Sequence, residues 1–243
     1  MKKIILCSTQ RSGSTMVVED MRNSEVLGNP EEYFIKWQSL GETSDIQKEI
    51  EILHNQGKKN DIFSVKLMAS QVKKVNELLQ NSTQFNDITE LFQDAHWVYI
   101  VRNDSLKQAI SRYIASITKV NHAVEHEGVK HFAGNIIKGN HENYNNDVPY
   151  DFNKIFQEYC NVKKENIFWE EFFVRFNIEP LVLEYEIYSK NESYKHLYDI
   201  ANHAQISEKL ISIKERKLKK LSNDVNKIFV ESFKNDIFER YYL

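Results

Sequence analysis

The sequence predicts an α/β fold with a central parallel β-sheet of about five strands flanked by helices. Three observations predict it. Short apolar runs recur along the chain, amphipathic stretches lie between them, and only 7 glycines and 3 prolines occur in 243 residues. A chain of this length can bury one sizeable core, so we expect a single domain over residues 1–243. The strand–helix alternation also predicts a functional site at the carboxyl ends of the strands.

The predicted strands are apolar runs that are too short for buried helices. Ile4 to Cys7 forms the first of them, and Trp97 to Val101 carries the strongest strand signal in the chain. The complete set lies at residues 4–7, 26–28, 62–67, 97–101 and 180–183.

The predicted helices are stretches whose apolar residues recur at helical spacing. They lie at residues 15–22, 46–53, 72–79, 106–117 and 152–176, and two or three more are expected near the C-terminus, one of them carrying Val225, Ile228, Phe229 and Phe233. We expect Trp169, Phe172 and Phe173 to belong to the core. The basic run from Lys214 to Lys220 is interpreted as a solvated helix face.

Residues 120–148 are polar and rich in His and Asn, so we interpret them as a mobile or substrate-facing insertion. This part of the chain contains His122, His126, His131 and His141. The first two are four residues apart, but no carboxylate or cysteine completes a recognised ligand pattern. We therefore expect no metal site here.

Net charge, cysteine content and the length of the apolar runs argue against several classes of protein. The net charge of −3 argues against nucleic-acid binding, because no global basic field exists. Cys7 and Cys160 are far apart and fit a reduced compartment, so we expect a cytoplasmic protein. The apolar run near the N-terminus is too short for an export signal, and no stretch approaches the roughly 18 apolar residues of a transmembrane segment.

The loop from Ser8 to Thr15 follows a predicted strand and opens a predicted helix, which is a favourable position for an anion. The first N–H groups of a helix lack intrahelical partners, and the helix dipole places partial positive charge there. Gly13 lets the backbone approach phosphate oxygens closely. The loop also offers hydroxyl donors from Ser12, Ser14 and Thr15 and a guanidinium from Arg11.

This loop differs from that of a nucleoside triphosphatase, in which a lysine follows the last glycine and reaches the phosphates. Here no lysine follows Gly13, and the cation, Arg11, precedes it. The loop therefore fits a 5′-phosphate and its substituent better than a triphosphate with magnesium. A serine-rich turn with a good N-cap is the simpler alternative.

Three further polar residues follow predicted strands, and each has a structural alternative. Arg102 comes directly after the 97–101 strand, and next to it Asp104 is expected to cap a helix, so Arg102 could be an ordinary surface residue. Glu32 could be a general base or half of a common carboxylate pair at a helix start. Lys66 could point into a cleft or lie on the surface at a strand end.

Several segments occur together in an order that resembles one family. They are Thr9–Thr15, Gly28–Phe34, Val65–Met68, Arg102–Asp104 with Gln108–Ser111, and Ile178–Leu181. In this order they resemble the trehalose 2-sulfotransferase-like family of bacterial carbohydrate sulfotransferases. The likeness runs from about residue 4 to residue 190.

The resemblance implies the P-loop-like sulfotransferase fold and a donor, 3′-phosphoadenosine 5′-phosphosulfate (PAPS), with no metal. It implies a hydroxyl of a carbohydrate or glycoconjugate as acceptor, and it suggests a homodimer. It assigns the general base to Glu32 and the 3′-phosphate to Arg102 and Ser111. From the residues themselves, Arg11 is the better candidate for stabilising the leaving phosphate, and Lys66 is a second candidate for assistance in catalysis. The donor's other end would bind Arg11, Ser12, Gly13, Ser14 and Thr15.

The C-terminal part departs from the family pattern. Where the family often has a Gln-Ala-Asp segment and a tryptophan, this chain has Lys217-Leu218-Lys219 and Val225. Recognition of the adenine base is therefore left open. Two alternatives from other classes are a P-loop-like nucleotide-binding phosphotransferase and a non-catalytic module that binds PAPS or its product adenosine 3′,5′-bisphosphate (PAP).

Overall fold

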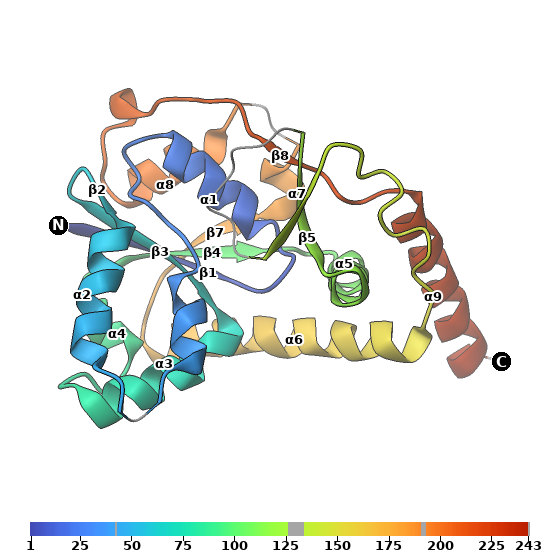
Figure 1. The fold of residues 1–243 in the computed structure, drawn as a ribbon, viewed down its shortest axis with the longest axis horizontal. Coiled ribbons are helices and arrows are strands. Elements are labelled where there is room, and N and C mark those ends of the chain that lie inside the picture. Colours follow the sequence, from blue (N-terminus) through green and yellow to red (C-terminus); the bar gives the residue numbers. More distant parts are fainter. Residues whose placement is uncertain (42, 126–133, 191–192, 243) are drawn as a thin grey trace. The chain divides into compact units, whose positions relative to one another are not determined.

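The computed structural model describes residues 1–41, 43–125, 134–190 and 193–242 (Figure 1). The chain divides into two compact units. Unit 1 comprises Met1–Val101 and Glu165–Glu215, and unit 2 comprises Arg102–Lys164 and Arg216–Leu243. A single domain over residues 1–243 stays a prediction.

Unit 1 contains a five-stranded sheet in the order β2-β3-β1-β4-β7 (Figure 1). Its strands are β1 (Lys2–Ser8), β2 (Lys58–Lys59), β3 (Ile62–Met68), β4 (His96–Val101) and β7 (Leu181–Glu184). All neighbouring pairs are parallel except the short β2, which runs antiparallel to β3. The predicted α/β fold with a mostly parallel central sheet of five strands is therefore confirmed.

Most predicted helices are found close to their expected bounds. Unit 1 contains α1 (Ser14–Asn23), α2 (Ile46–Gly57), α3 (Ala69–Ser82), α4 (Ile88–Leu91), α7 (Tyr185–Tyr188), α8 (Lys195–His203) and the 3₁₀ helices η1 (Tyr33–Ser39) and η2 (Glu208–Leu210). The long α6 (Phe152–Arg175) continues from unit 2 into unit 1.

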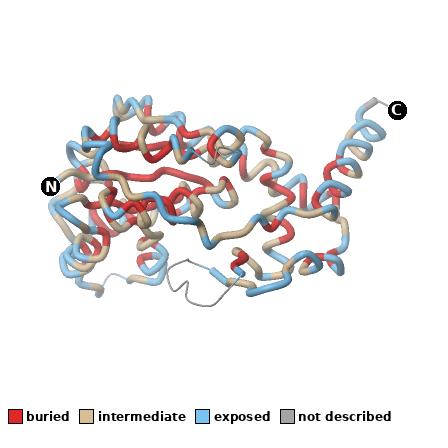
Figure 2. The backbone as a smooth tube through the Cα atoms, turned by 90° about the horizontal axis from the view of Figure 1, so that it is seen from above, coloured by how far each residue is buried: buried red, intermediate tan, exposed pale blue. Residues whose placement is uncertain are grey.

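Two hydrophobic layers enclose the sheet of unit 1, because successive side chains of a strand point to opposite faces. Ile5 and Cys7 of β1 pack in one core with residues of α2, α3 and α4, whereas Ile4 and Leu6 pack in the other with α1 and α8. Figure 2 shows buried backbone through the middle of the unit and exposed outer turns of the helices. The expected core residues Trp169, Phe172 and Phe173 are buried in the first layer.

This topology places a switch point at β1. Its neighbours β3 and β4 lie on opposite sides of it, and all three strands are parallel. Ser8 at the end of β1 pairs with Met68 at the end of β3 and with Ile100 near the end of β4. Parallel sheets bind ligands at such carboxyl edges.

Unit 2 has its own core. It contains α5 (Ser105–Thr118), the first part of α6, α9 (Asp224–Tyr242) and a sheet of β5 (Val120–Val124), β6 (Asn135–Lys138) and β8 (Leu218–Lys219) in the order β6-β5-β8. Tyr113, Phe229 and Phe233 are buried in this core. Ile228, expected on the same helix, is exposed.

The predicted strand at residues 26–28 is wrong. This segment is irregular, and Glu25 and Gly28 have φ of 67° and 81°. Such left-handed backbone interrupts an extended strand. The chain instead turns here. The residues that follow make isolated backbone hydrogen bonds to neighbouring segments; for example, the Lys66 N–H donates to the Glu31 carbonyl at 2.9 Å.

Two polar segments contain strands that the sequence did not predict. Residues 120–124 and 135–138 of the expected insertion form β5 and β6, which pair in parallel, while residues 126–133 lie outside the described residues. The run from Lys214 to Lys220 is not helical, because Leu218 and Lys219 pair antiparallel with β5. In both segments, the strands form because they pair with a segment elsewhere in the chain.

Candidate active site

The loop between β1 and α1 has the local features of an anion site. Gly13 is the N-cap of α1 with φ of 90°, and no side chain caps the helix. The first turn of α1 has no acidic residue, so no carboxylate of that turn competes for its N–H groups. Arg11, with φ of 62°, is half-buried in this loop. Of the predicted hydroxyl donors, Ser12 and Ser14 are buried and Thr15 is half-buried.

Aromatic side chains contact this loop through hydrogen bonds to its backbone and through packing against Gly13. The Trp169 indole N–H donates to the Ser8 carbonyl at 3.0 Å, and the Tyr188 hydroxyl donates to the Ser12 carbonyl at 3.4 Å. A Cβ at Gly13 would lie 2.3 Å from a ring carbon of Tyr185. Glycine is therefore required here both by its positive φ and by the close packing of Tyr185. The packing could not be predicted from the sequence.

Glu32 is held by two side chains from α3 and β3. Its Oε2 lies 2.8 Å from the Lys66 ammonium, and its Oε1 accepts a hydrogen bond from the Gln71 amide at 3.0 Å. The side chains of Lys66 and Glu32 are only 7% and 14% exposed, so water screens this ion pair weakly. Lys66 is thus a buried residue and not a surface lysine at a strand end.

Glu31 points to a different partner. The Arg22 guanidinium of α1 donates to its carboxylate at 2.8 Å, and both side chains are largely buried. Burial raises the pKa of Glu31 to about 7, although the charges of Arg22 and Lys66 oppose this shift. The two neighbouring glutamates are therefore fixed by separate cations, one on α1 and one on β3.

We expect Glu31 to make unfolding pH-dependent. Its pKa rises from 4.5 in an unfolded chain to about 7 in the fold, so the folded chain retains a proton that the unfolded chain releases. The stabilisation is complete below pH 4.5 and is lost as pH rises through 7, by up to about 3 kcal/mol. Urea unfolding at pH 5 and pH 8 would show a larger loss for the wild-type protein than for Glu31→Gln. Equal losses would mean that Arg22 keeps Glu31 ionised throughout.

Arg102 and Ser111 belong to unit 2. Arg102 is half-buried and follows β4 directly in the chain, and Ser111 lies on α5. Asp104 caps α5 as expected, because its carboxylate accepts from the Lys107 N–H at 3.0 Å. Burial opposes ionisation of Asp104, but hydrogen bonds from Lys107 and the charges of Lys107 and Arg102 lower its pKa below the usual value.

The Stf0 sulphotransferase family matches residues 3–236, nearly the whole chain. The chain belongs to the Stf0 sulphotransferase family. It is therefore an enzyme that transfers sulfuryl groups, and the resemblance inferred from its motifs is confirmed. Comparison with curated proteins gave no match.

Membership of the Stf0 family disfavours the two alternatives that the residues alone left open, a phosphotransferase and a non-catalytic module. Within the described ranges, no helix has both the length and the apolar content needed to cross a membrane. The same ranges bring together no group of three His, Cys, Asp or Glu side chains that could hold a metal ion. His126 and His131 lie outside them.

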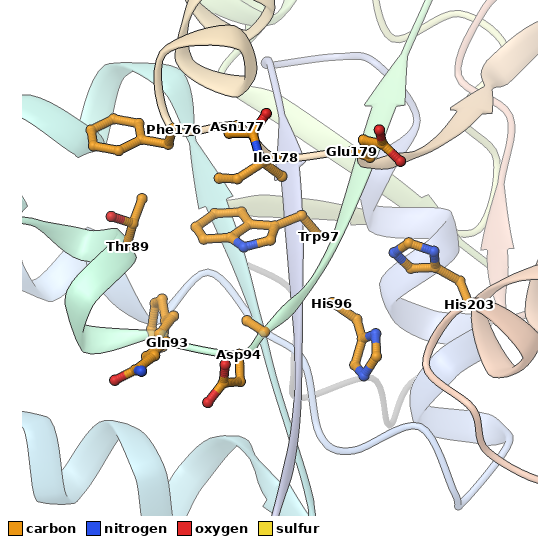
Figure 3. A pocket seen from close by; sticks show the side chains of 12 residues that line it. Thr89, Gln93, Asp94, His96, Trp97, Phe176, Asn177, Ile178, Glu179 and His203 are labelled. Atoms are coloured by element: carbon orange, nitrogen blue, oxygen red, sulfur yellow. The ribbon is translucent and has the colours of Figure 1, made fainter.

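This sulfotransferase has a cavity of about 430 Å³ at the amino-terminal end of β4, opposite to the carboxyl edge of the sheet (Figure 3). Trp97, Phe176 and Ile178 line one part of it, and the rings of His96 and His203 are 5.6 Å apart in another. Among the described residues that line it, none was predicted for the active site. The cavity lies where β4 begins, whereas Ser8 and Met68 end β1 and β3 at the carboxyl edge, so the two places are separate.

Sequence reasoning missed the residues that support the site in the Stf0 protein. Gln71 has only a partial signal: it lies at the third position after the N-cap of α3, where a capping box has Glu or Gln, but the N-cap is Met68 and not Ser or Thr. Arg22, Tyr185 and Tyr188 have none, since each reaches the site only through tertiary packing. Trp169 was correctly placed in the core, but its hydrogen bond to the Ser8–Thr15 loop (the candidate anion loop, or anion loop) was not predicted.

Proposed function

We propose that this sulfotransferase moves the sulfuryl group of PAPS to a hydroxyl of a carbohydrate or glycoconjugate, with Glu32 as the general base. The observation that carries the proposal is the Glu32 carboxylate, held by Lys66 of β3, the strand that pairs with β1, and by Gln71 of α3. A sugar hydroxyl is a weak nucleophile, so a base in a fixed position helps to remove its proton.

The anion loop fits the 5′ end of PAPS. Ser12 is fully buried, and its hydroxyl has no hydrogen-bond partner among the described residues, so it is available as a donor. The uncapped start of α1 offers backbone N–H groups, and Arg11 supplies a positive charge. Arg102 and Ser111 are the residues that the family resemblance assigns to the 3′-phosphate.

PAPS supplies a sulfuryl group already bonded to a good leaving group, its 5′-phosphate. Glu32 accepts the proton of the acceptor hydroxyl while the hydroxyl oxygen forms its bond to sulfur, and the bond from sulfur to the phosphate oxygen breaks. The electron pair of that bond stays on the phosphate. Arg11 stabilises the negative charge that develops there, and Lys66 stabilises the ionised state of Glu32 before transfer.

We expect PAP, the product of the donor, to raise the melting temperature. At 100 times its dissociation constant a ligand adds roughly 2.7 kcal/mol, or roughly 5–10 °C for a chain of this size. Arg11→Ala and Arg102→Ala should each abolish the shift. Lys73→Ala, which removes an exposed cation on α3, should retain it. A shift produced by ATP with magnesium, but not by PAP, would favour a phosphotransferase.

The acceptor is tested separately. Sulfur-labelled PAPS is incubated with the protein and a panel of free sugars, trehalose among them, and with a glycolipid extract. Mass spectrometry then identifies products that gain one sulfuryl group. Labelling confined to molecules without a sugar would overturn the carbohydrate part of the proposal and leave the donor part standing.

A further inference from the structure

The amide of Gln71 bridges the start of α3 and the Glu32 carboxylate. It lies in the first turn of α3 and is 4% exposed. Its Oε1 accepts from the Met68 backbone N–H at 3.0 Å, and its Nε2 donates to Glu32 Oε1 at 3.0 Å. We propose that Gln71 is a positioning residue that holds Glu32 in the geometry of a general base. This inference rests on the proposed function.

The backbone fixes which way the amide points. A backbone N–H can only donate, so the oxygen of Gln71 must face Met68 and its NH₂ group must face Glu32. The NH₂ group can then only donate to Glu32, whose carboxylate oxygen accepts. The first turn of α3 therefore fixes both the place and the hydrogen-bonding role of the side chain.

Two different donors hold the two oxygens of Glu32. Lys66 contacts Oε2, and Gln71 contacts Oε1, so rotation of the carboxylate would break at least one contact. Each carboxylate oxygen can accept a further hydrogen bond, which leaves capacity for the acceptor hydroxyl. Because misplacement by about 1 Å can cost about 100-fold in rate, fixing this group matters to the transfer step.

A neutral donor suits this task better than a second cation. Lys66 already offsets the charge of Glu32, and a second positive charge would weaken its affinity for the incoming proton. The Gln71 amide orients the carboxylate with a smaller effect on that affinity. An exclusively structural role would need only its oxygen, which caps α3, and would not need the contact to Glu32, 39 residues away.

The substitution Gln71→Glu separates these two roles. It keeps an oxygen for the Met68 N–H but replaces the donor to Glu32 with a like charge. We expect the PAP-induced melting shift to remain, kcat to fall by about 10-fold or more, and the KM of the sugar acceptor to change little. The acid limb of the pH–rate profile should move to higher pH, because a neighbouring carboxylate disfavours the ionised form of Glu32. Gln80→Glu, the same change at an exposed position of α3, should leave rate and profile unchanged.

Gln71→Met, which adds no charge, provides a second test if Gln71→Glu does not fold. It should also lower kcat, with a smaller shift of the acid limb than in Gln71→Glu, because it removes the donor without adding a negative charge. Wild-type kcat in a folded Gln71 variant, together with a large loss in Glu32→Gln, would overturn this inference alone. Full transfer by Glu32→Gln, or no transfer by the wild-type protein, would overturn the proposed function and this inference with it.

Discussion

Glu32→Gln is expected to keep binding PAP and to lose sulfuryl transfer by about 100-fold or more, the usual contribution of a general base. The substitution preserves the size of the side chain but removes the group that accepts the proton. Its amide oxygen can still face Lys66, while its NH₂ group must then face the NH₂ group of Gln71. Some loss of stability, about 1–3 kcal/mol, is therefore expected as well.

Two measurements separate these effects. The melting shift produced by PAP, taken relative to each variant's own melting temperature, reports donor binding. The rate of label transfer from PAPS to a sugar reports the chemistry. Glu31→Gln is the matched control, because it makes the same change in the adjacent residue, which pairs with Arg22 instead of Lys66. Transfer by Glu32→Gln within a few-fold of wild type would remove Glu32 from its assigned role.

The parts of the fold that the sequence predicted are those governed by local patterns. The strands at residues 4–7 and 97–101 are continuous apolar runs and that at 62–67 is mostly apolar, and burial on both faces favours such runs. The helix at 106–117 shows its apolar stripe directly in the sequence. The position of the loop at residues 8–15 was predictable for the same reason, since a strand, a short polar loop and a helix follow one another, while its binding of an anion stays a prediction.

The parts that were missed depend on contacts between distant residues. The apolar content of residues 26–28 suggested a strand, but the turn at Glu25 and Gly28 and the approach of the chain to β3 decide the structure. The small sheet of unit 2 joins Ala123 to Lys219, two residues far apart in the sequence. In the candidate site, the role of Lys66 stays a prediction, and its pairing with Glu32 follows only from the register of β3 and the path of residues 28–32.

The ion pair of Lys66 and Glu32 predicts a large effect on stability as well as on activity. Lys66→Met leaves the Glu32 carboxylate largely buried without its cation, and removal of one partner of a buried pair costs about 3–5 kcal/mol. Lys73→Met provides a matched control on α3. Lys73 is 90% exposed and lies 3.9 Å from Glu77, so its loss should change the unfolding free energy by less than about 0.5 kcal/mol.

A double-mutant cycle tests whether Lys66 acts through Glu32. In Lys66→Met combined with Glu32→Gln, no charge of the pair remains buried, so the double variant should lose less unfolding free energy than the sum of the two single variants. Urea unfolding at pH 7 measures each term, and we expect a coupling of about 1–3 kcal/mol. Additive losses would show that Lys66 stabilises the fold through other contacts. Glu32 would then be held mainly by Gln71. The Gln71 variants should in that case lose more of the transfer rate than Lys66→Met does.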